Sequence, residues 1–107
     1  MAIAGTELTA ISAYNNANQT AYDTASLTAT ANKLYLLLIC GTATTTGRTI
    51  SSVAGGGLGT WTKIAGCAAN GTSYSIGAAW AWSAAPTAGA AITVTFSGAM
   101  TGFVCAL

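Results

Sequence analysis

The stretch KLYLLLIC at residues 33–40 decides the fold class of this chain. Successive side chains of an extended strand point to opposite faces, so positions 34, 36, 38 and 40 share one face and positions 35, 37 and 39 share the other. Both sets are apolar. A strand that is apolar on both faces is covered on both faces, and in a two-layer domain one of those covers can be another subunit.

The rest of the chain alternates short, Thr-rich apolar segments with Gly, Asn and Ser clusters about every 8–12 residues, and no segment has the periodicity of a helix. The glycines at 55–57 and 59 predict a turn or bulge. Asn70-Gly71 predicts a type I′ hairpin turn, because both residues tolerate positive φ. The predicted fold class is all-β, a single two-sheet, jelly-roll-like β-sandwich of about eight short strands. The expected strands cover residues 8–14, 22–31, 33–40, 48–53, 60–67, 73–82, 91–96 and 103–107.

A chain of 107 residues suits one domain rather than two. We expect residues 1–19 to form an N-terminal arm and first strand that could contact a neighbouring subunit, and residues 20–107 to form the sandwich. The longest strongly apolar run, residues 34–40, is far shorter than the roughly 20 residues of a membrane-spanning helix. No basic and apolar leader follows Met1, which predicts synthesis without classical secretion.

Charge is scarce and unevenly placed. The chain holds three Lys or Arg, two Asp or Glu and no His, so charged residues make up 5% of it. The share in an average protein is about 25%. A net charge of +1 provides no phosphate-binding surface, which argues against nucleic acid as a partner. Every charged residue precedes Ile64, so we expect neighbouring subunits to pack on the C-terminal half.

The titratable residues form no catalytic or metal-binding pattern. Glu7 and Asp23 are assigned to surface solubility, because nothing in their spacing brings them together. A cysteine nucleophile needs a neighbouring base, and no histidine is present to serve Cys40, Cys67 or Cys105. These cysteines also lack the spacing of a metal site. We therefore predict no catalytic residue, no metal, no cofactor and no small-molecule ligand.

Two kinds of covalent modification are compatible with the sequence. The favoured state of Cys40, Cys67 and Cys105 is three reduced, buried thiols. The alternatives are a disulfide between Cys40 and Cys105, which both lie in apolar strand-like runs, or an intermolecular link. Asn18 and Asn70 begin glycosylation triplets, which we expect to stay unmodified in a chain without a secretion signal.

The three tryptophans are the largest apolar side chains available for burial or recognition. Trp61, Trp80 and Trp82 lie on strands expected to be adjacent, where such residues usually anchor a core or a subunit interface. Stacking of the same rings on a sugar is the alternative, and it makes a carbohydrate-binding module the third functional hypothesis.

Four short motifs, in their order along the chain, resemble a known group of proteins. They are NKLYL at 32–36, SVAGGGLGTWTKI at 52–64, WAWSAAPTAG at 80–89 and ITVTFSG at 92–98. Together they are similar to small β-sandwich modules of tailed bacteriophages and prophages, which occur in capsid decoration, head-fibre and tail-associated proteins. The resemblance covers roughly residues 20–107. It implies a non-enzymatic structural subunit displayed on a particle, and it brings no catalytic residues with it.

The leading hypothesis is a virion structural protein, made in a host cytoplasm and placed on the virion surface as a capsid decoration or other repeated subunit. It would associate with copies of itself and with a capsid or tail protein. Scarce charge and strands that are apolar on both faces support this hypothesis. The candidate interface residues are Leu34, Leu36, Leu38, Trp80, Trp82, Phe103, Val104 and Leu107.

The second hypothesis is an extracellular filament or pilus-like polymer. In that case residues 2–14 of one subunit would be donated as a strand to the next subunit.

Overall fold

The computed structural model describes residues 5–8, 13–44 and 48–107. These residues form nine strands and one short 3₁₀ turn, η1, at Ala65–Cys67. None of them forms a helix that is long and apolar enough to cross a membrane. The strands are β1 (Ala13–Asn15), β2 (Gln19–Leu27), β3 (Lys33–Thr42), β4 (Ile50–Gly55), β5 (Thr62–Lys63), β6 (Ala69–Asn70), β7 (Tyr74–Ser83), β8 (Ala90–Met100) and β9 (Gly102–Ala106).

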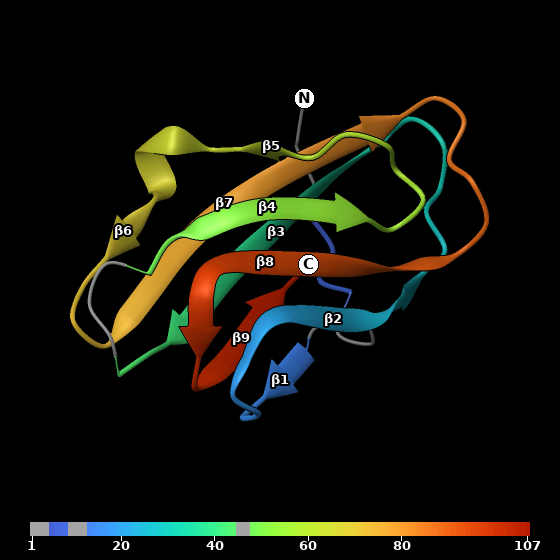
Figure 1. The fold of residues 1–107 in the computed structure, drawn as a ribbon. Helices are drawn as coiled ribbons and strands as arrows, with labels where there is room; N and C mark the ends of the chain where they lie inside the picture. The colour runs from blue at the N-terminus through green and yellow to red at the C-terminus, as the bar shows by residue number, and fades with distance from the viewer. Residues whose placement is uncertain (1–4, 9–12, 45–47) are drawn as a thin grey trace.

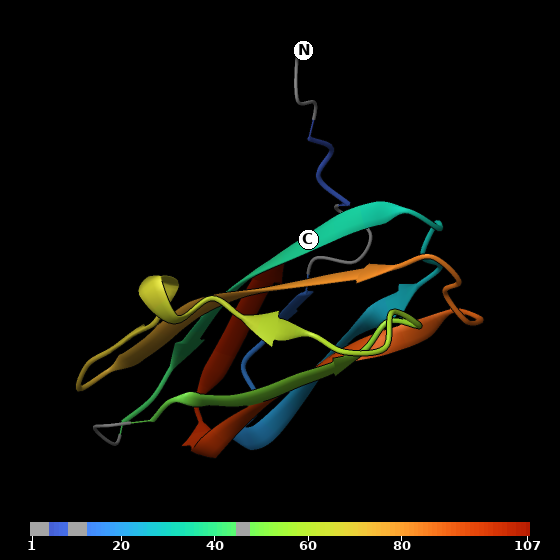
Figure 2. The ribbon, with the colours of Figure 1, turned by 90° about the horizontal axis from the view of Figure 1, so that it is seen from above.

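The strands form two antiparallel sheets that pack face to face. The larger sheet has the order β1-β9-β3-β7-β5, with β6 also paired to β7, and the smaller sheet has the order β2-β8-β4. Figure 1 shows the smaller sheet in front of the larger one, and Figure 2 shows the same two layers from above. The predicted all-β sandwich is therefore confirmed.

The strand pairs are nested like those of one long hairpin folded over itself. β1 pairs with β9, β2 with β8 and β3 with β7, and an isolated bridge joins Ala54 to Thr60 at the tip of the nest. This nesting is the jelly-roll-like arrangement. One strand departs from it, because β5 pairs with β7 through Thr62 and Trp80 instead of extending the smaller sheet. As a result, β4 lies at the edge of a three-stranded sheet.

The core fills the space between the sheets. β3 contributes Tyr35, Leu37 and Ile39, which are all buried. Three aromatic rings join both layers: Tyr22 of β2 stacks on Phe103 of β9 with ring centres 5.0 Å apart, and Phe96 of β8 meets both rings edge-on. The Tyr22 hydroxyl lies within hydrogen-bonding distance of the carbonyl oxygens of Ala17, at 2.6 Å, and Met100, at 2.9 Å.

The glycine-rich turn after β4 is confirmed. Gly55, Gly56, Gly57 and Gly59 all have positive φ, a conformation that disfavours residues with a Cβ. At Gly55, with φ of 89°, a Cβ would in addition collide with the carbonyl oxygen of Ala91 in β8. The turn therefore requires glycine there for two separate reasons.

Two predicted local structures are wrong in detail. The hairpin before β7 exists, but Asn70 pairs with Ser75 and the Gly71 N–H donates to the Tyr74 carbonyl at 2.9 Å, so the two-residue loop is 72–73. Gly71 and Asn70 lack the positive φ of a type I′ turn. The strand expected over 60–67 is limited to β5, because the chain turns into η1.

The N-terminal part of the predicted organisation also shifts. The first strand, expected over 8–14, is described as β1, and residues 9–12 lie outside the described part. Since β1 pairs with β9, the sandwich begins before residue 20.

Candidate interaction surface

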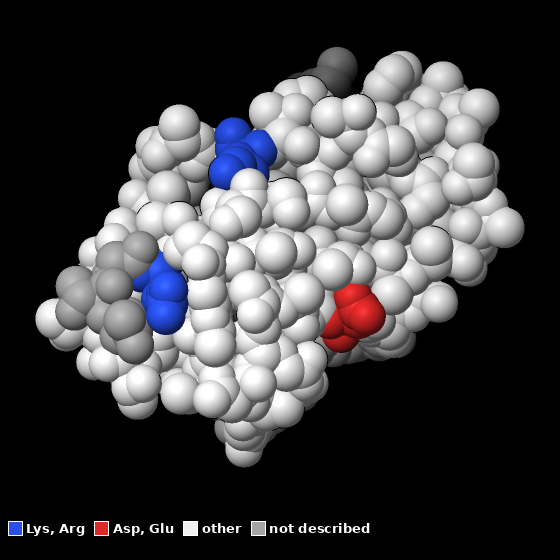
Figure 3. Space-filling view, viewed as in Figure 1, with Lys and Arg blue, Asp and Glu red and all other residues white. Residues whose placement is uncertain are grey.

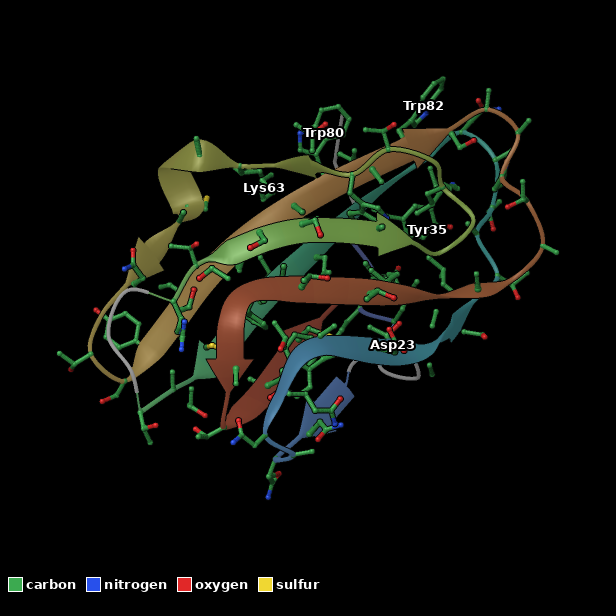
Figure 4. The ribbon with its side chains drawn as sticks, viewed as in Figure 1. Asp23, Tyr35, Lys63, Trp80 and Trp82 are labelled. Atoms are coloured by element: carbon green, nitrogen blue, oxygen red, sulfur yellow. The ribbon has the colours of Figure 1, made fainter. Side chains whose placement is uncertain are left out.

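The outer face of the larger sheet is the side that points away from the smaller sheet. Strand alternation places the even-numbered residues of β3, β7 and β9 on this face. Leu34 lies opposite Trp82, and Leu36 lies opposite Trp80, across the β3–β7 pair. In Figure 4 the two tryptophans project from β7 on the side away from β4 and β8.

Every large apolar side chain that is exposed among the described residues lies on this outer face. The exposed fraction ranges from 40% at Trp80 and Ile76 to 68% at Leu34. An isolated exposed apolar residue is ordinary, but a contiguous patch of this kind marks an interaction site. The eight residues are Leu34, Leu36, Leu38, Tyr74, Ile76, Trp80, Trp82 and Val104.

The strand positions of the outer face carry no charge, and Glu7 and Lys33 lie at its margin, where they line the hollow beside Leu34 and Leu36. The even-numbered residues of β3, β7 and β9 include no Asp, Glu, Lys or Arg. Among soluble antiparallel sheets the solvent side usually carries polar side chains. β3 is apolar on both faces, and the smaller sheet covers only its inner face. The sequence pattern therefore predicts a second cover on the outer face.

Large and small side chains are distributed unevenly along the outer face. Two successive rows hold Trp82 with Leu34 and Trp80 with Leu36. The following row holds Leu38 between the small residues Ala78 and Ala106. A shallow hollow of about 220 Å³ adjoins that row, and its lining residues are Leu38, Ile39, Cys40, Gly77, Val104, Cys105 and Ala106.

Six of the eight predicted interface residues lie on the outer face. Phe103 and Leu107 do not: they are 2% and 8% exposed and belong to the core, so this part of the prediction is wrong. The reason is alternation along β9, where only Val104 and Ala106 point outward. The prediction missed Tyr74 and Ile76, although they share the parity of Trp80 and Trp82 along the same strand.

The proposed disulfide between Cys40 and Cys105 is also wrong. Cys105 pairs in register with Ile39, whereas Cys40 pairs with Val104, so the two sulfur atoms lie on opposite faces of the larger sheet. All three cysteines are present as thiols. Cys105 is buried, Cys40 is half-buried on the outer face, and Cys67 is exposed on η1, which corrects the expectation of three buried thiols.

Charged side chains on the side of the smaller sheet form hydrogen bonds with other residues of the chain. Asp23 of β2 accepts a hydrogen bond from the Thr93 hydroxyl at 2.6 Å. The Lys63 ammonium donates to the carbonyl oxygens of Ile50, at 3.0 Å, and Ser51, at 2.9 Å. Figure 3 shows that the charges on the side of the smaller sheet are scattered rather than clustered. Within the described ranges, no group of His, Cys, Asp and Glu could hold a metal ion.

The three tryptophans divide into two classes. Trp61 is 7% exposed, and its indole N–H donates to the Gly55 carbonyl at 3.0 Å, so it anchors the core next to the glycine-rich turn. Trp80 and Trp82 remain available for recognition. Both predicted glycosylation triplets begin at exposed residues, Asn18 and Asn70.

Two further hollows lie at the margins of the larger sheet. One, of about 550 Å³, separates residues 5–8 from Lys33, Leu34 and Leu36. Figure 2 shows the described N-terminal segment leaving the sandwich on the side of the larger sheet. The other, of about 380 Å³, lies between the start of β4 and the segment from Lys63 to Asn70, and is lined mainly by Ile and Ala side chains.

Comparison of the chain with protein-family models, with curated proteins and with solved structures gives no match.

Proposed function

We propose that this protein is a non-enzymatic structural subunit that assembles through the outer face of its larger sheet, as a repeated component of a virion surface. One observation carries the proposal: the exposed large apolar side chains of the described residues all gather on one face, whose strand positions carry no charged residue. A face of this composition resembles the core of a stable subunit interface, which is apolar and depleted of charge.

The topology gives the proposal a second, weaker support. Jelly-roll sandwiches are the architecture of many viral capsid domains, and the nested pairing of this chain belongs to that class. The same architecture also serves lectins, so fold alone does not decide the function. The composition of the outer face therefore carries more weight than the topology, and the resemblance to phage virion modules points in the same direction.

The edges of the smaller sheet favour association through the outer face over donation of a strand to that sheet. An added strand needs a regular edge with unpaired backbone groups. The edge strand β2 is irregular at two places, between Gln19 and Ala21 and between Asp23 and Ser26. The edge strand β4 has two of its carbonyl groups, those of Ile50 and Ser51, engaged by Lys63. Both features are devices that block edge-to-edge pairing.

Light scattering after size-exclusion chromatography, combined with electron microscopy, tests the proposal. We expect closed oligomers at micromolar concentration, or binding to protein particles that display a repeated lattice. A stable monomer with no affinity for such particles would overturn it. Open helical filaments would support strand donation instead.

Deletion of residues 2–7 separates these two modes of assembly. The deletion leaves β1 in place and preserves the Leu8 N–H, which donates to the Leu107 carbonyl at 2.6 Å. Closed oligomers assembled through the face should survive it, whereas polymers assembled by donation of that segment should not.

Carbohydrate binding is a second candidate, because Trp80 and Trp82 lie exposed on a flat strand surface. Indole rings in that position can stack on sugar rings. A shift in tryptophan fluorescence with one glycan of a panel, abolished by Trp82→Ala, would favour this function. Unchanged fluorescence across the panel would remove it.

A further inference from the structure

We propose that the outer face is covered by the same face of a second copy of this chain, related by a two-fold axis that lies in the plane of contact and crosses the strands. This inference rests on the proposed function and specifies the partner and its orientation. Its basis is the area, the charge and the shape of the outer face.

The area of the face matches what a stable pair requires. The exposed parts of its eight large apolar side chains amount to roughly 800 Å² per copy, which is the area that each partner contributes to a standard interface. A second copy therefore needs no additional surface to form a stable pair. The largest apolar patch on a typical monomer is about 300–600 Å².

The lack of charge favours an identical partner. Two copies meeting through the even-numbered residues of β3, β7 and β9 bring no charged side chain from these strands into the contact. A partner that presented charged groups would lose their hydration without finding an opposite charge on the outer face. Self-association thus avoids an electrostatic cost that a charged partner would have.

The distribution of bulk selects the direction of the axis. Large and small side chains pack well when they face each other, because protein contacts fill space without voids. An axis that crosses the strands over Leu38 and Ala78 brings the larger β3 side chains of one copy, Leu34 and Leu36, onto the smaller β3 side chains of the other, Thr42 and Cys40. Leu36 of one copy then faces Cys40 of the second copy, beside the hollow that Cys40 lines. An axis that runs along β3 would instead place Leu36 against Leu36.

The resulting interface is isologous, since each contact occurs twice. Leu34 of one copy faces Thr42 of the second copy, and Trp80 faces Ile76. The two larger sheets become the inner layers of a four-layer stack, and the facing β3 strands run antiparallel across the contact.

Disulfide trapping tests this arrangement in the full chain. The variant carries Leu36→Cys together with Cys67→Ser, so that Cys40 is the other thiol on the outer face. Positions 36 and 40 are four residues apart on one strand, roughly 13 Å, which is too far for a bond within one chain. Mild oxidation with copper-phenanthroline should link position 36 of one copy to Cys40 of another, as identified by mass spectrometry of the linked peptides.

A second variant keeps Leu36, and it tests the same arrangement if the substitution at that position prevents folding or association. Leu34→Cys with Thr42→Cys, in a background of Cys40→Ser and Cys67→Ser, changes exposed or half-buried side chains and leaves the core intact. It should give links between positions 34 and 42 of different copies. Ala21→Cys with Cys67→Ser, placed on an exposed position of β2 in the smaller sheet, is the matched control and should form no dimer link.

The outcomes separate this inference from the proposed function. Oligomers linked at 36–36 and 40–40 would overturn the axis that crosses the strands. Oligomers that form none of these links, neither 36–40 nor 34–42 nor 36–36 nor 40–40, would overturn the pairing of the outer faces. The proposed assembly function would stand in that case. A chain that remains monomeric but binds a lattice particle would overturn the identical partner alone. A monomer without any such affinity would overturn both.

Discussion

Leu36 and Trp80 lie directly opposite each other on β3 and β7, and both side chains point away from the core with 46% and 40% of their surface exposed. Cross-strand pairs stabilise a sheet through contact between their two side chains. Here they form part of the outermost layer of the sandwich. The predictions below follow from this pair and from the core beneath it.

A lysine at position 36 should dissociate the assembly without unfolding the sandwich. In Leu36→Lys the ammonium group would be buried in an apolar contact, so we expect the dissociation constant to rise at least tenfold, about 1.4 kcal/mol. The melting temperature of the monomer should change by only a few degrees, because position 36 faces away from the core. Sedimentation equilibrium measures the association.

The control for that prediction is Ala21→Lys, which places the same charge on an exposed position of β2. It should leave the dissociation constant within a factor of about two of the native value. Equal weakening by both variants would indicate a general effect of added positive charge and would contradict the assignment to the outer face.

Association should be insensitive to ordinary salt and to pH near neutrality. The outer strand positions carry no Asp, Glu, Lys or Arg, and the chain has no histidine. Raising sodium chloride from about 0.05 to 0.5 M screens exposed charges and should leave the dissociation constant almost unchanged, whereas sulfate should tighten binding. The constant should also stay level between about pH 5.5 and 7.5. A steep weakening with sodium chloride would show that ion pairs hold the subunits together.

Removal of the Tyr22 hydroxyl should destabilise the fold. This group lies within hydrogen-bonding distance of the Met100 and Ala17 carbonyls, and Tyr22 is only 1% exposed. Tyr22→Phe should lower the free energy of unfolding by about 1–3 kcal/mol, because a buried acceptor loses its donor. Denaturant titration at fixed protein concentration measures the change. The exposed Tyr74→Phe should alter it by less than about 0.5 kcal/mol.

Alanine substitutions in the glycine-rich turn should differ according to the space around each position. Gly55 and Gly59 both have positive φ, at 89° and 78°, so each alanine adds a backbone cost of about 1–2 kcal/mol. At Gly55 the new methyl group also meets the Ala91 carbonyl, whereas the space around Gly59 is open. Gly55→Ala should therefore lower the melting temperature well below that of Gly59→Ala. Equal shifts would show that the contact with β8 relaxes freely.

The fold class and the position of β3 could be predicted from the sequence because alternation is a local property. The segment at 33–40 shows two apolar faces, and one of them is the core face in the structure. The same rule, applied strictly to residues 103–107, separates Val104 from the buried Phe103 and Leu107. The error there came from treating an apolar run as a single surface.

Other features depend on contacts between distant residues and have no local signal. The pairing of Thr62 with Trp80, which moves β5 to the larger sheet, is determined by the whole nest of strands. The register that places Cys40 beside Val104, rather than beside Cys105, is likewise set across the β3–β9 pair. The hairpin at 70–75 had a strong turn signal, but the tertiary pairing of β6 moved the loop by two residues.

Alkylation of the native cysteines as a function of protein concentration tests most directly whether copies bury the outer face between them. Cys40 lies on that face, and Cys67 is an exposed internal reference on η1. As the protein concentration rises through the range in which the molecular mass of the assembly increases, the alkylation rate of Cys40 should fall at least tenfold, while that of Cys67 stays constant. In Leu36→Lys both rates should stay constant. A native oligomer in which Cys40 remains as reactive as in the monomer would contradict the account.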